Sequence, residues 1–361
     1  MARKSRQKNK AALRDALLLV SPGTELREAI AAIIQSRNGA LLCIGDPKRL
    51  AETSEGGVEI NAEVTPQLLY EVAKMDGAII LNEDSTRIMY ANRYIKTDTS
   101  IPSDETGTRH RAAERLAKQT GCIVVAVSER RSTVTLYVHD AKHILDSIST
   151  LLNKSMQALN TLEKYVRALD QATTELSTRE FEDVVTIFDV CKAVQRSEMG
   201  TRIAREIEPY ILELGSEGRL VDMQLQELLI PFEEAQLVAK DYYREKGGIK
   251  YEQALERVAE ITSEELLELS NISNALGYSA NLKSIDTYLS PRGYRILTQT
   301  RRLTPQIIEN LVQKFGSLQQ IMRAPKEELC TVDGIGEVLA ERIRLSLNSL
   351  RNQLAMDRVR R

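Results

Sequence analysis

Short apolar runs alternate with helical patterns over the first 150 residues of the chain. Four runs with consecutive apolar positions predict strands at residues 40–44, 78–81, 123–127 and 134–138. Between them, apolar positions with helical spacing predict helices at residues 26–34, 66–75 and 109–119. Alternating strands and helices predict an α/β fold. Strands that are apolar at consecutive positions predict a sheet covered on both faces.

From about residue 144 to residue 289 the apolar positions keep a helical spacing almost throughout. Glycine and proline predict breaks at Gly200, at residues 215–218, at Pro231 and at residues 247–248. The pattern therefore indicates several helices rather than one coiled coil. A helical bundle of this kind more often spaces or assembles domains than performs catalysis.

The residues after 289 contain a glycine-rich turn between two helical patterns. Thr331-Val332-Asp333-Gly334-Ile335-Gly336-Glu337 follows a short helix at 325–329 and precedes a longer one at 340–350. Two glycines let the turn approach a phosphate, and the second helix presents free N–H groups to it. A degenerate copy is expected at 290–294. The alternative is a glycine-rich turn that only packs two helices together.

Composition indicates a folded protein, because 42% of the residues are hydrophobic and 28% are charged. No apolar run approaches the roughly 18 residues that span a bilayer, and the run behind the basic start is too short for a signal peptide. A cytoplasmic protein is expected. The four cysteines lie far apart, and His139 and His143 lack a third ligand at metal spacing, so neither a zinc site nor a disulfide framework is indicated.

Charge divides the chain into the same three regions as the periodicity. The formal net charge is +2 over residues 1–150, −10 over 151–290 and +6 over 291–361. Such a division predicts units with different partners, and the basic tail is a candidate for binding phosphate backbones. We therefore predict a multidomain α/β and all-α protein with domains at 1–147, 148–288 and 289–361.

Two clusters in the first region carry candidate chemistry. Asp76-Gly77-Ala78 places a carboxylate at the entry of a predicted strand, where it can hold a divalent cation; the alternative is a simple Asp-Gly turn. Residues 105–114, ETGTRHRAAE, place Arg-His-Arg in the first turn of a predicted helix, where N–H groups and cationic side chains favour a polyphosphate. The alternative is a capped surface helix whose arginines pair with Glu105 and Glu114.

Together, Asp76-Gly77-Ala78 and Gly107-Thr108-Arg109-His110-Arg111 resemble the paired signature of diadenylate cyclase domains, over roughly residues 10–145. The whole chain is similar to the bacterial family of DNA-integrity scanning diadenylate cyclases. That family joins a cyclase domain to a helical spine and a helix-hairpin-helix domain. The resemblance implies that two ATP molecules condense to cyclic di-AMP and two pyrophosphates, with Mg²⁺ or Mn²⁺ as cofactor. It also implies a homo-oligomer, an octamer with face-to-face cyclase domains, and no membrane.

The resemblance further implies roles for individual residues. Asp76 would bind the metal and help deprotonate the attacking hydroxyl, and Gly77 would contact the nucleotide through its backbone. Ile95 would line the adenine pocket, and Ser128 would contact phosphate or metal. The phosphates would be held by Thr108, Arg109, His110 and Arg111, with Ala112 closing the loop.

The glycine-rich turn gives the candidate DNA contacts, and these would reach the backbone of branched or damaged DNA without reading its sequence. They are Gly334, Ile335, Gly336, Arg342 and Arg344. The leading hypothesis is a diadenylate cyclase coupled to DNA binding. The alternative is a DNA-binding scaffold that senses ATP without turning it over.

Overall fold

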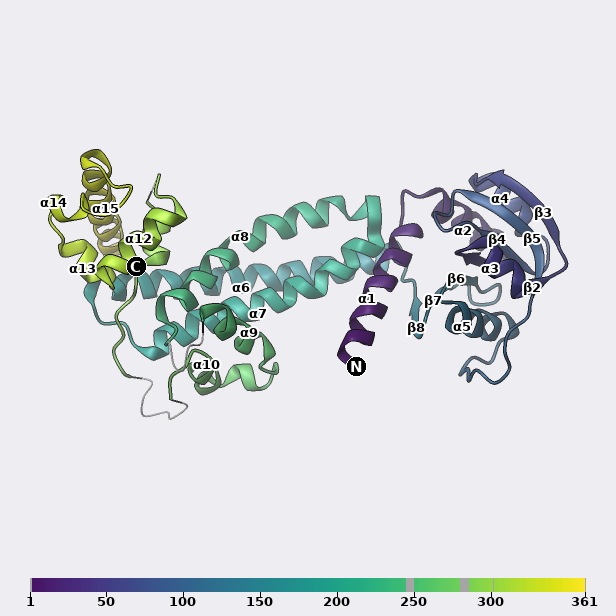
Figure 1. Ribbon diagram of the computed structural model, residues 1–361, viewed down its shortest axis with the longest axis horizontal. Helices are drawn as coiled ribbons and strands as arrows, with labels where there is room; N and C mark the ends of the chain where they lie inside the picture. Colours follow the sequence, from purple (N-terminus) through teal and green to yellow (C-terminus); the bar gives the residue numbers. More distant parts are fainter. Residues whose placement is uncertain (1, 245–249, 280–285, 301, 361) are drawn as a thin grey trace. The chain divides into compact units, whose positions relative to one another are not determined.

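The computed structural model describes residues 2–244, 250–279, 286–300 and 302–360. The chain divides into two compact units (Figure 1). The first unit contains Met1–Gln157 and Ile207–Met223, and the second contains Ala158–Glu206 and Gln224–Arg361.

An eight-stranded sheet forms the centre of the first unit, in the order β2-β5-β4-β1-β6-β7-β8 with β3 paired to β5. Its strands are β1 (Ala40–Ile44), β2 (Ser54–Glu55), β3 (Val58–Glu63), β4 (Ala78–Leu81), β5 (Arg87–Ile95), β6 (Ile123–Val127), β7 (Val134–Val138) and β8 (Ala141–Ile144). Only β1 and β4 pair in parallel, and the other pairings are antiparallel. The sheet is therefore mixed.

Helices cover both faces of the sheet. They are α1 (Ala2–Leu19), α2 (Glu25–Gln35), α3 (Pro47–Glu52), α4 (Pro66–Val72) and α5 (Thr108–Thr120). All five residues of β1 are buried. Leu42 and Ile44 join the core beneath α1, α2 and α4, whereas Leu41 and Cys43 join the core beneath α5. This alternation confirms the prediction that the sheet is covered on both faces.

The four strands predicted from apolar runs are confirmed at the same residues. The helix predicted at 66–75 ends earlier, at Val72, and leaves a turn before β4. The other four strands, β2, β3, β5 and β8, were not predicted. β3 is largely exposed, and β5 and β8 mix polar with apolar side chains.

Long helices dominate the middle of the chain: α6 (Ile148–Glu182), α7 (Ile187–Leu214) and α8 (Arg219–Tyr242), with the 3₁₀ turn η1 (Gly215–Gly218) between the last two. The break predicted at 215–218 is confirmed. Those predicted at Gly200 and Pro231 are wrong, because both residues lie inside helices. Residues 247–248 lie outside the described residues. In the part of the chain that is described, no helix has the length and apolar character to cross a bilayer.

Shorter helices complete the second unit around two apolar cores. They are α9 (Tyr251–Glu260), η2 (Glu265–Leu267), α10 (Leu269–Ala275), α11 (Tyr294–Thr298), α12 (Pro305–Phe315), α13 (Leu318–Arg323), α14 (Lys326–Leu329) and α15 (Glu337–Arg360). The helices α12 to α15 share one core with α11. The predicted helix–turn–helix is therefore present as α14, a turn and α15, which starts three residues earlier than expected.

The segment 290–294 does not form a second copy of that turn, so this prediction is wrong. The backbone N–H groups of Gly293, Tyr294 and Arg295 all donate to the carboxylate of Asp241, at 2.6–2.9 Å. Arg292 donates to carbonyl oxygens at the end of α8. The donors that would meet a phosphate are thus occupied within the protein itself.

Candidate nucleotide site and DNA-binding hairpin

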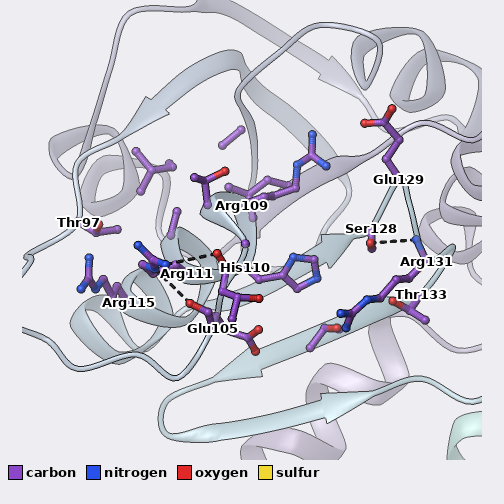
Figure 2. A pocket seen from close by; sticks show the side chains of 18 of the residues that line it. Thr97, Glu105, Arg109, His110, Arg111, Arg115, Ser128, Glu129, Arg131 and Thr133 are labelled. Atoms are coloured by element: carbon purple, nitrogen blue, oxygen red, sulfur yellow. Dashed lines mark hydrogen bonds between the residues drawn. The ribbon is translucent and has the colours of Figure 1, made fainter.

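A cavity of about 750 Å³ opens in the first unit beside the start of α5 (Figure 2). Its walls come from the loop before α5, the edges of β4 and β5, the turn between β6 and β7, and β8. It is lined by Leu41, Gly77, Ala78, Arg93, Tyr94, Ile95, Thr97, Glu105, Thr106, Gly107, Thr108, Arg109, His110, Arg111, Ala112, Arg115, Ser128, Glu129, Arg130, Arg131, Thr133, Thr135, Lys142 and Ile144.

The lining of the cavity is strongly cationic. Seven arginine and lysine side chains face it, against two glutamates, Glu105 and Glu129. Concentrated positive charge in a concave site attracts anions, and guanidinium groups form paired hydrogen bonds with phosphate oxygens. The cavity therefore suits a polyphosphate better than a neutral ligand.

The N-terminus of α5 adds backbone donors to this charge. Its N-cap residue is Gly107, which makes no side-chain capping bond, and the first turn contains no acidic residue. Other helices of the same unit are capped by side chains, for example α2 by Thr24 and α4 by Thr65. The first N–H groups of α5 are consequently free to bind a ligand anion, as helix N-termini do.

The two arginines of the first turn are held without a carboxylate partner. Arg111 donates to the backbone oxygens of Glu105 and Thr106, at 3.1 and 3.3 Å (Figure 2). The guanidinium of Arg109 lies against Gly39. Among the described residues, no carboxylate lies within 4.0 Å of either guanidinium.

The alternative reading of this helix as a capped surface helix is therefore wrong. The carboxylates that were expected to neutralise its arginines have other partners. Glu114 pairs with Lys118 at 2.7 Å, and Glu105 pairs with Lys142 at 2.5 Å. Both arginine charges remain available to an anionic ligand.

His110 stands between these arginines, half-buried at the wall of the cavity. Its ring meets the ring of Tyr137 edge to face, with centroids 6.4 Å apart and an angle of 76°. Burial lowers the pKa of His110 and the charge of Arg109 lowers it further, although Glu105 opposes this shift. The imidazole is thus neutral near pH 7 in the absence of a ligand and offers a hydrogen bond rather than a full charge.

The structure brings most of the predicted nucleotide-binding residues into one place. Those that line the cavity are Gly77, Ile95, Thr108, Arg109, His110, Arg111, Ala112 and Ser128. Asp76 is exposed and adjoins the cavity only through its neighbour Gly77. The predicted roles of all nine residues remain predictions.

Gly77 has a structural requirement of its own. Its φ is +90°, and an added Cβ would lie 2.9 Å from the backbone oxygen of Arg93 in β5. A side chain is therefore excluded by the close approach of the neighbouring strand as well as by backbone conformation. The same close approach brings the backbone of Gly77 to the cavity.

On the opposite wall, Ser128 was predicted, but the charged residues that follow it were not. The turn between β6 and β7 carries Glu129 and Arg131 into the lining (Figure 2), and Arg130 lines the cavity as well. It is closed by a 2.9 Å bond from the N–H of Ser128 to the oxygen of Thr133. The sequence feature that could have indicated these residues is a charged run between two valine-rich strands. Such a run is typical of any hairpin turn and does not by itself indicate a site.

The hairpin of the second unit separates its predicted residues into two kinds. Gly334 and Gly336 are exposed in the turn, and an added Cβ at Gly336 would meet nothing within 4 Å. Ile335 is buried in the core shared by α11 to α15, with 5% of its surface exposed. It anchors the turn, so any DNA contact there would come from its backbone.

The two predicted arginines lie on α15 behind the turn. Arg344 is exposed and lies 3.6 Å from Glu341, while Arg342 is partly exposed. Exposed ion pairs of this kind contribute little, so both charges can reach a phosphate backbone. The role of these five residues in DNA binding remains a prediction.

Comparison with known proteins gives the same three-part order. Residues 27–142 match the family model described as DisA bacterial checkpoint controller nucleotide-binding. Residues 145–285 match the DisA bacterial checkpoint controller linker region, and residues 303–354 match a helix-hairpin-helix motif. The chain is also 50% identical over 339 residues to the DNA integrity scanning protein DisA of Carboxydothermus hydrogenoformans, covering 94% of this chain and 96% of that protein. This chain belongs to the DisA family.

Other DisA family members are similarly close. The protein of the same name from Clostridium botulinum strain Kyoto is 46% identical over 348 residues, covering 96% of this chain and 98% of its own length. A weaker likeness, with 23% identity and a TM-score of 0.27, relates 40% of this chain to 90% of the DacA chain from Staphylococcus aureus.

Proposed function

We propose that this protein is a diadenylate cyclase that condenses two ATP molecules into cyclic di-AMP and couples this reaction to DNA binding. The observation that carries the proposal is the cationic cavity at the uncapped N-terminus of α5. Membership of a family whose matching region is described as nucleotide-binding supports it. Its place in the cell would be the cytoplasm, in association with the nucleoid.

The reaction is a nucleotidyl transfer. The 3′-oxygen of one ATP forms a bond to the α-phosphorus of the other, the bond from that phosphorus to the β-phosphate oxygen breaks, and pyrophosphate leaves. A second transfer, in which the two nucleotides exchange roles, closes the ring and releases the second pyrophosphate. Such transfers require charge neutralisation and in-line positioning more than covalent help. Arg109, Arg111 and the free N–H groups of α5 can supply both.

A single cavity would hold one of the two ATP molecules. The second must be presented by another copy of the domain, so that each copy contributes half of the reaction centre. We infer that two cyclase domains face each other in a homo-oligomer, and we expect an octamer. Tyr94 and Ile144 fit this arrangement, since both line the cavity yet are 70% and 53% exposed.

The residues at this site can hold a divalent cation only if the phosphates of the substrate supply further ligands. In the described residues, no group of three or more His, Cys, Asp or Glu side chains could hold a metal. Mg²⁺ is commonly held by one or two carboxylates, substrate phosphates and water, and Asp76 beside Gly77 can supply one carboxylate. When bound, Mg²⁺ or Mn²⁺ would supply charge to the phosphates, and Asp76 would also accept the proton of the attacking hydroxyl.

The second unit would bind the DNA backbone through the turn between α14 and α15. Exposed glycines let the turn approach a phosphate, and α15 begins at Glu337, directly after Gly336, so its first N–H groups adjoin the turn. Such contacts do not read bases. Branched or damaged DNA would be chosen by its shape, consistent with a checkpoint role.

The test is to incubate the purified full-length protein with ATP and Mg²⁺ or Mn²⁺ and to identify the product by mass spectrometry, with and without branched DNA. Cyclic di-AMP is expected. Asp76→Asn should lose at least about 100-fold in turnover, the usual scale for a removed acid-base group, while DNA binding remains. ATP that stays intact under every metal and protein concentration would instead indicate an ATP-sensing scaffold.

A further inference from the structure

Three side chains form a closed group at one wall of the cavity. An oxygen of Glu105, Oε1, accepts a 2.7 Å hydrogen bond from the hydroxyl of Tyr137 and lies 2.5 Å from Nζ of Lys142. The three residues come from the loop before α5, from β7 and from β8. Only 16% of the Glu105 side chain is exposed, and Tyr137 is 1% exposed. A carboxylate this buried needs paired donors, and these two residues provide them.

Lys142 differs from the arginines of the cavity because its charge is already paired. Arg109 and Arg111 have no carboxylate within 4.0 Å among the described residues, whereas Lys142 lies directly on Glu105. Without Lys142, a negative charge would remain beside the start of α5 and would repel phosphate. Lys142 therefore removes an unfavourable charge from the site.

Glu105 also fixes the residues that would hold the nucleotide phosphates. Its backbone oxygen accepts the 3.1 Å bond from Nε of Arg111. Its carboxylate holds the hydroxyl of Tyr137, whose ring supports the ring of His110. The loop before α5 is thus joined to the β7–β8 hairpin at the point where the helix begins.

We propose that Glu105 is a positioning residue of the nucleotide site, and that Lys142 acts on ATP through Glu105 rather than by contacting phosphate. The inference rests on the proposed function, because it takes the nucleotide phosphates to bind at the start of α5. It assigns different tasks to two kinds of cation in the cavity. Arg109 and Arg111 meet the ligand, and Lys142 neutralises the residue that orients Arg111 directly and His110 through Tyr137.

The electrostatics of His110 agree with this assignment. The charged groups that act on it are Glu105 from the loop, Arg109 from its own helix, Lys142 from β8 and Arg131 from the β6–β7 turn. Burial, Arg109, Lys142 and Arg131 lower the pKa of His110, and Glu105 alone among these groups raises it. Glu105 is itself ionised, since hydrogen bonds from Lys142 and Tyr137 outweigh its burial and lower its pKa.

A double-mutant cycle separates the two possible tasks of Lys142. Binding of a non-hydrolysable ATP analogue would be measured by calorimetry for Lys142→Met, Glu105→Gln and the double variant. Lys142→Met should weaken binding about fivefold, and the double variant should bind within about twofold of Glu105→Gln, as coupled neighbours do. If Lys142 contacts phosphate directly, the double variant will instead lose a further fivefold, and this outcome would overturn the proposal.

A matched ion pair on the same helix provides the control. Lys118 and Glu114 lie 2.7 Å apart on α5, and neither residue lines the cavity. Lys118→Met and Glu114→Gln should leave binding of the analogue unchanged, singly and together. A comparable non-additive loss in this pair would show that the cycle reports helix stability, and it would also overturn the proposal.

Titration of the histidines tests the positioning without any turnover. The chain has three histidines, and His110 can be assigned in an NMR spectrum by its loss in His110→Asn. Glu105→Gln removes a negative charge beside the imidazole, so the pKa of His110 should fall. An unchanged His110 pKa would overturn the proposal.

Tyr137→Phe is the second variant, in case Glu105→Gln does not fold. It removes one hydroxyl and keeps the ring that supports His110, so turnover should fall more than affinity for ATP. If Tyr137→Phe lost ATP binding as completely as a misfolded protein does, this result would count against positioning. A protein without cyclase activity would contradict the proposed function alone, because analogue binding and the histidine titration do not depend on turnover.

Discussion

Gly39 has no functional group, yet it determines where the guanidinium of Arg109 lies. The guanidinium lies over Gly39, at the position that any larger residue would fill. An added Cβ at Gly39 would lie 2.0 Å from Nη1 and 2.7 Å from Cζ of Arg109. Gly39 therefore creates the space in which the guanidinium faces the cavity, although it stands outside every motif.

We expect Gly39→Ala to weaken binding of an ATP analogue roughly fivefold to tenfold, because the guanidinium must leave its place while its charge-assisted bonds to phosphate are lost. The thermal unfolding midpoint should change little, since the end of a flexible side chain can move. Calorimetry and a melting curve measure the two effects. Gln35→Ala, an exposed position at the end of α2, is the control. Unchanged affinity in Gly39→Ala would mean that this position of Arg109 is not used in binding.

At the scale of the elements, the helices α7 and α8 are held close together by a small residue. Gly200 lies inside α7, and an added Cβ would meet the ring of Phe232 at 2.0 Å. Phe232 belongs to α8 and is 1% exposed, so its ring has little room to move. The glycine that suggested a helix break from sequence is thus a packing position.

Gly200→Ala should destabilise the protein by about 1–2 kcal/mol, because the clash with a buried ring exceeds the gain in helix propensity. Urea unfolding would measure the change in free energy. In a Phe232→Leu background the same substitution should cost much less, since the clash is relieved. Equal costs in both backgrounds would contradict close packing at this point.

At the scale of the whole molecule, charge assigns different partners to the two ends of the chain. The cavity in the first unit gathers seven cationic side chains, and residues 291–361 carry a net charge of +6. The residues between them, at −10, are unfavourable for phosphate. Two phosphate-bearing ligands, one small and one polymeric, are therefore kept at separate places in the chain.

Binding of DNA should weaken steeply as salt is raised, because counterions are released from each neutralised phosphate. Replacing Arg342 and Arg344 by alanine should lower the slope of log K against log salt by about 1–2 and leave cyclase activity in the absence of DNA intact. Fluorescence anisotropy at several salt concentrations measures the slope. Arg167→Ala, with an 82% exposed side chain on α6, is the control for loss of a surface charge. A slope that does not change would place the DNA contact elsewhere.

The sequence by itself determined the order of the three regions, the four buried strands, and the start of the helix that carries Arg-His-Arg. These features depend on local periodicity and on residues adjacent in the chain, which a single sequence displays directly. Strands with mixed polarity were missed, since β3, β5 and β8 are shaped by their pairing partners.

Only the tertiary structure decided how the cavity is completed. Tyr137 and Glu105 are 32 residues apart in the sequence. Gly39, directly before β1, lies against Arg109 of α5. The same is true of Asp241, which occupies the N–H donors that the sequence offered to a phosphate at 293–295. A charged or small side chain has no partner until the chain folds back on itself, so its task depends on which distant residues the sheet and the helices bring beside it.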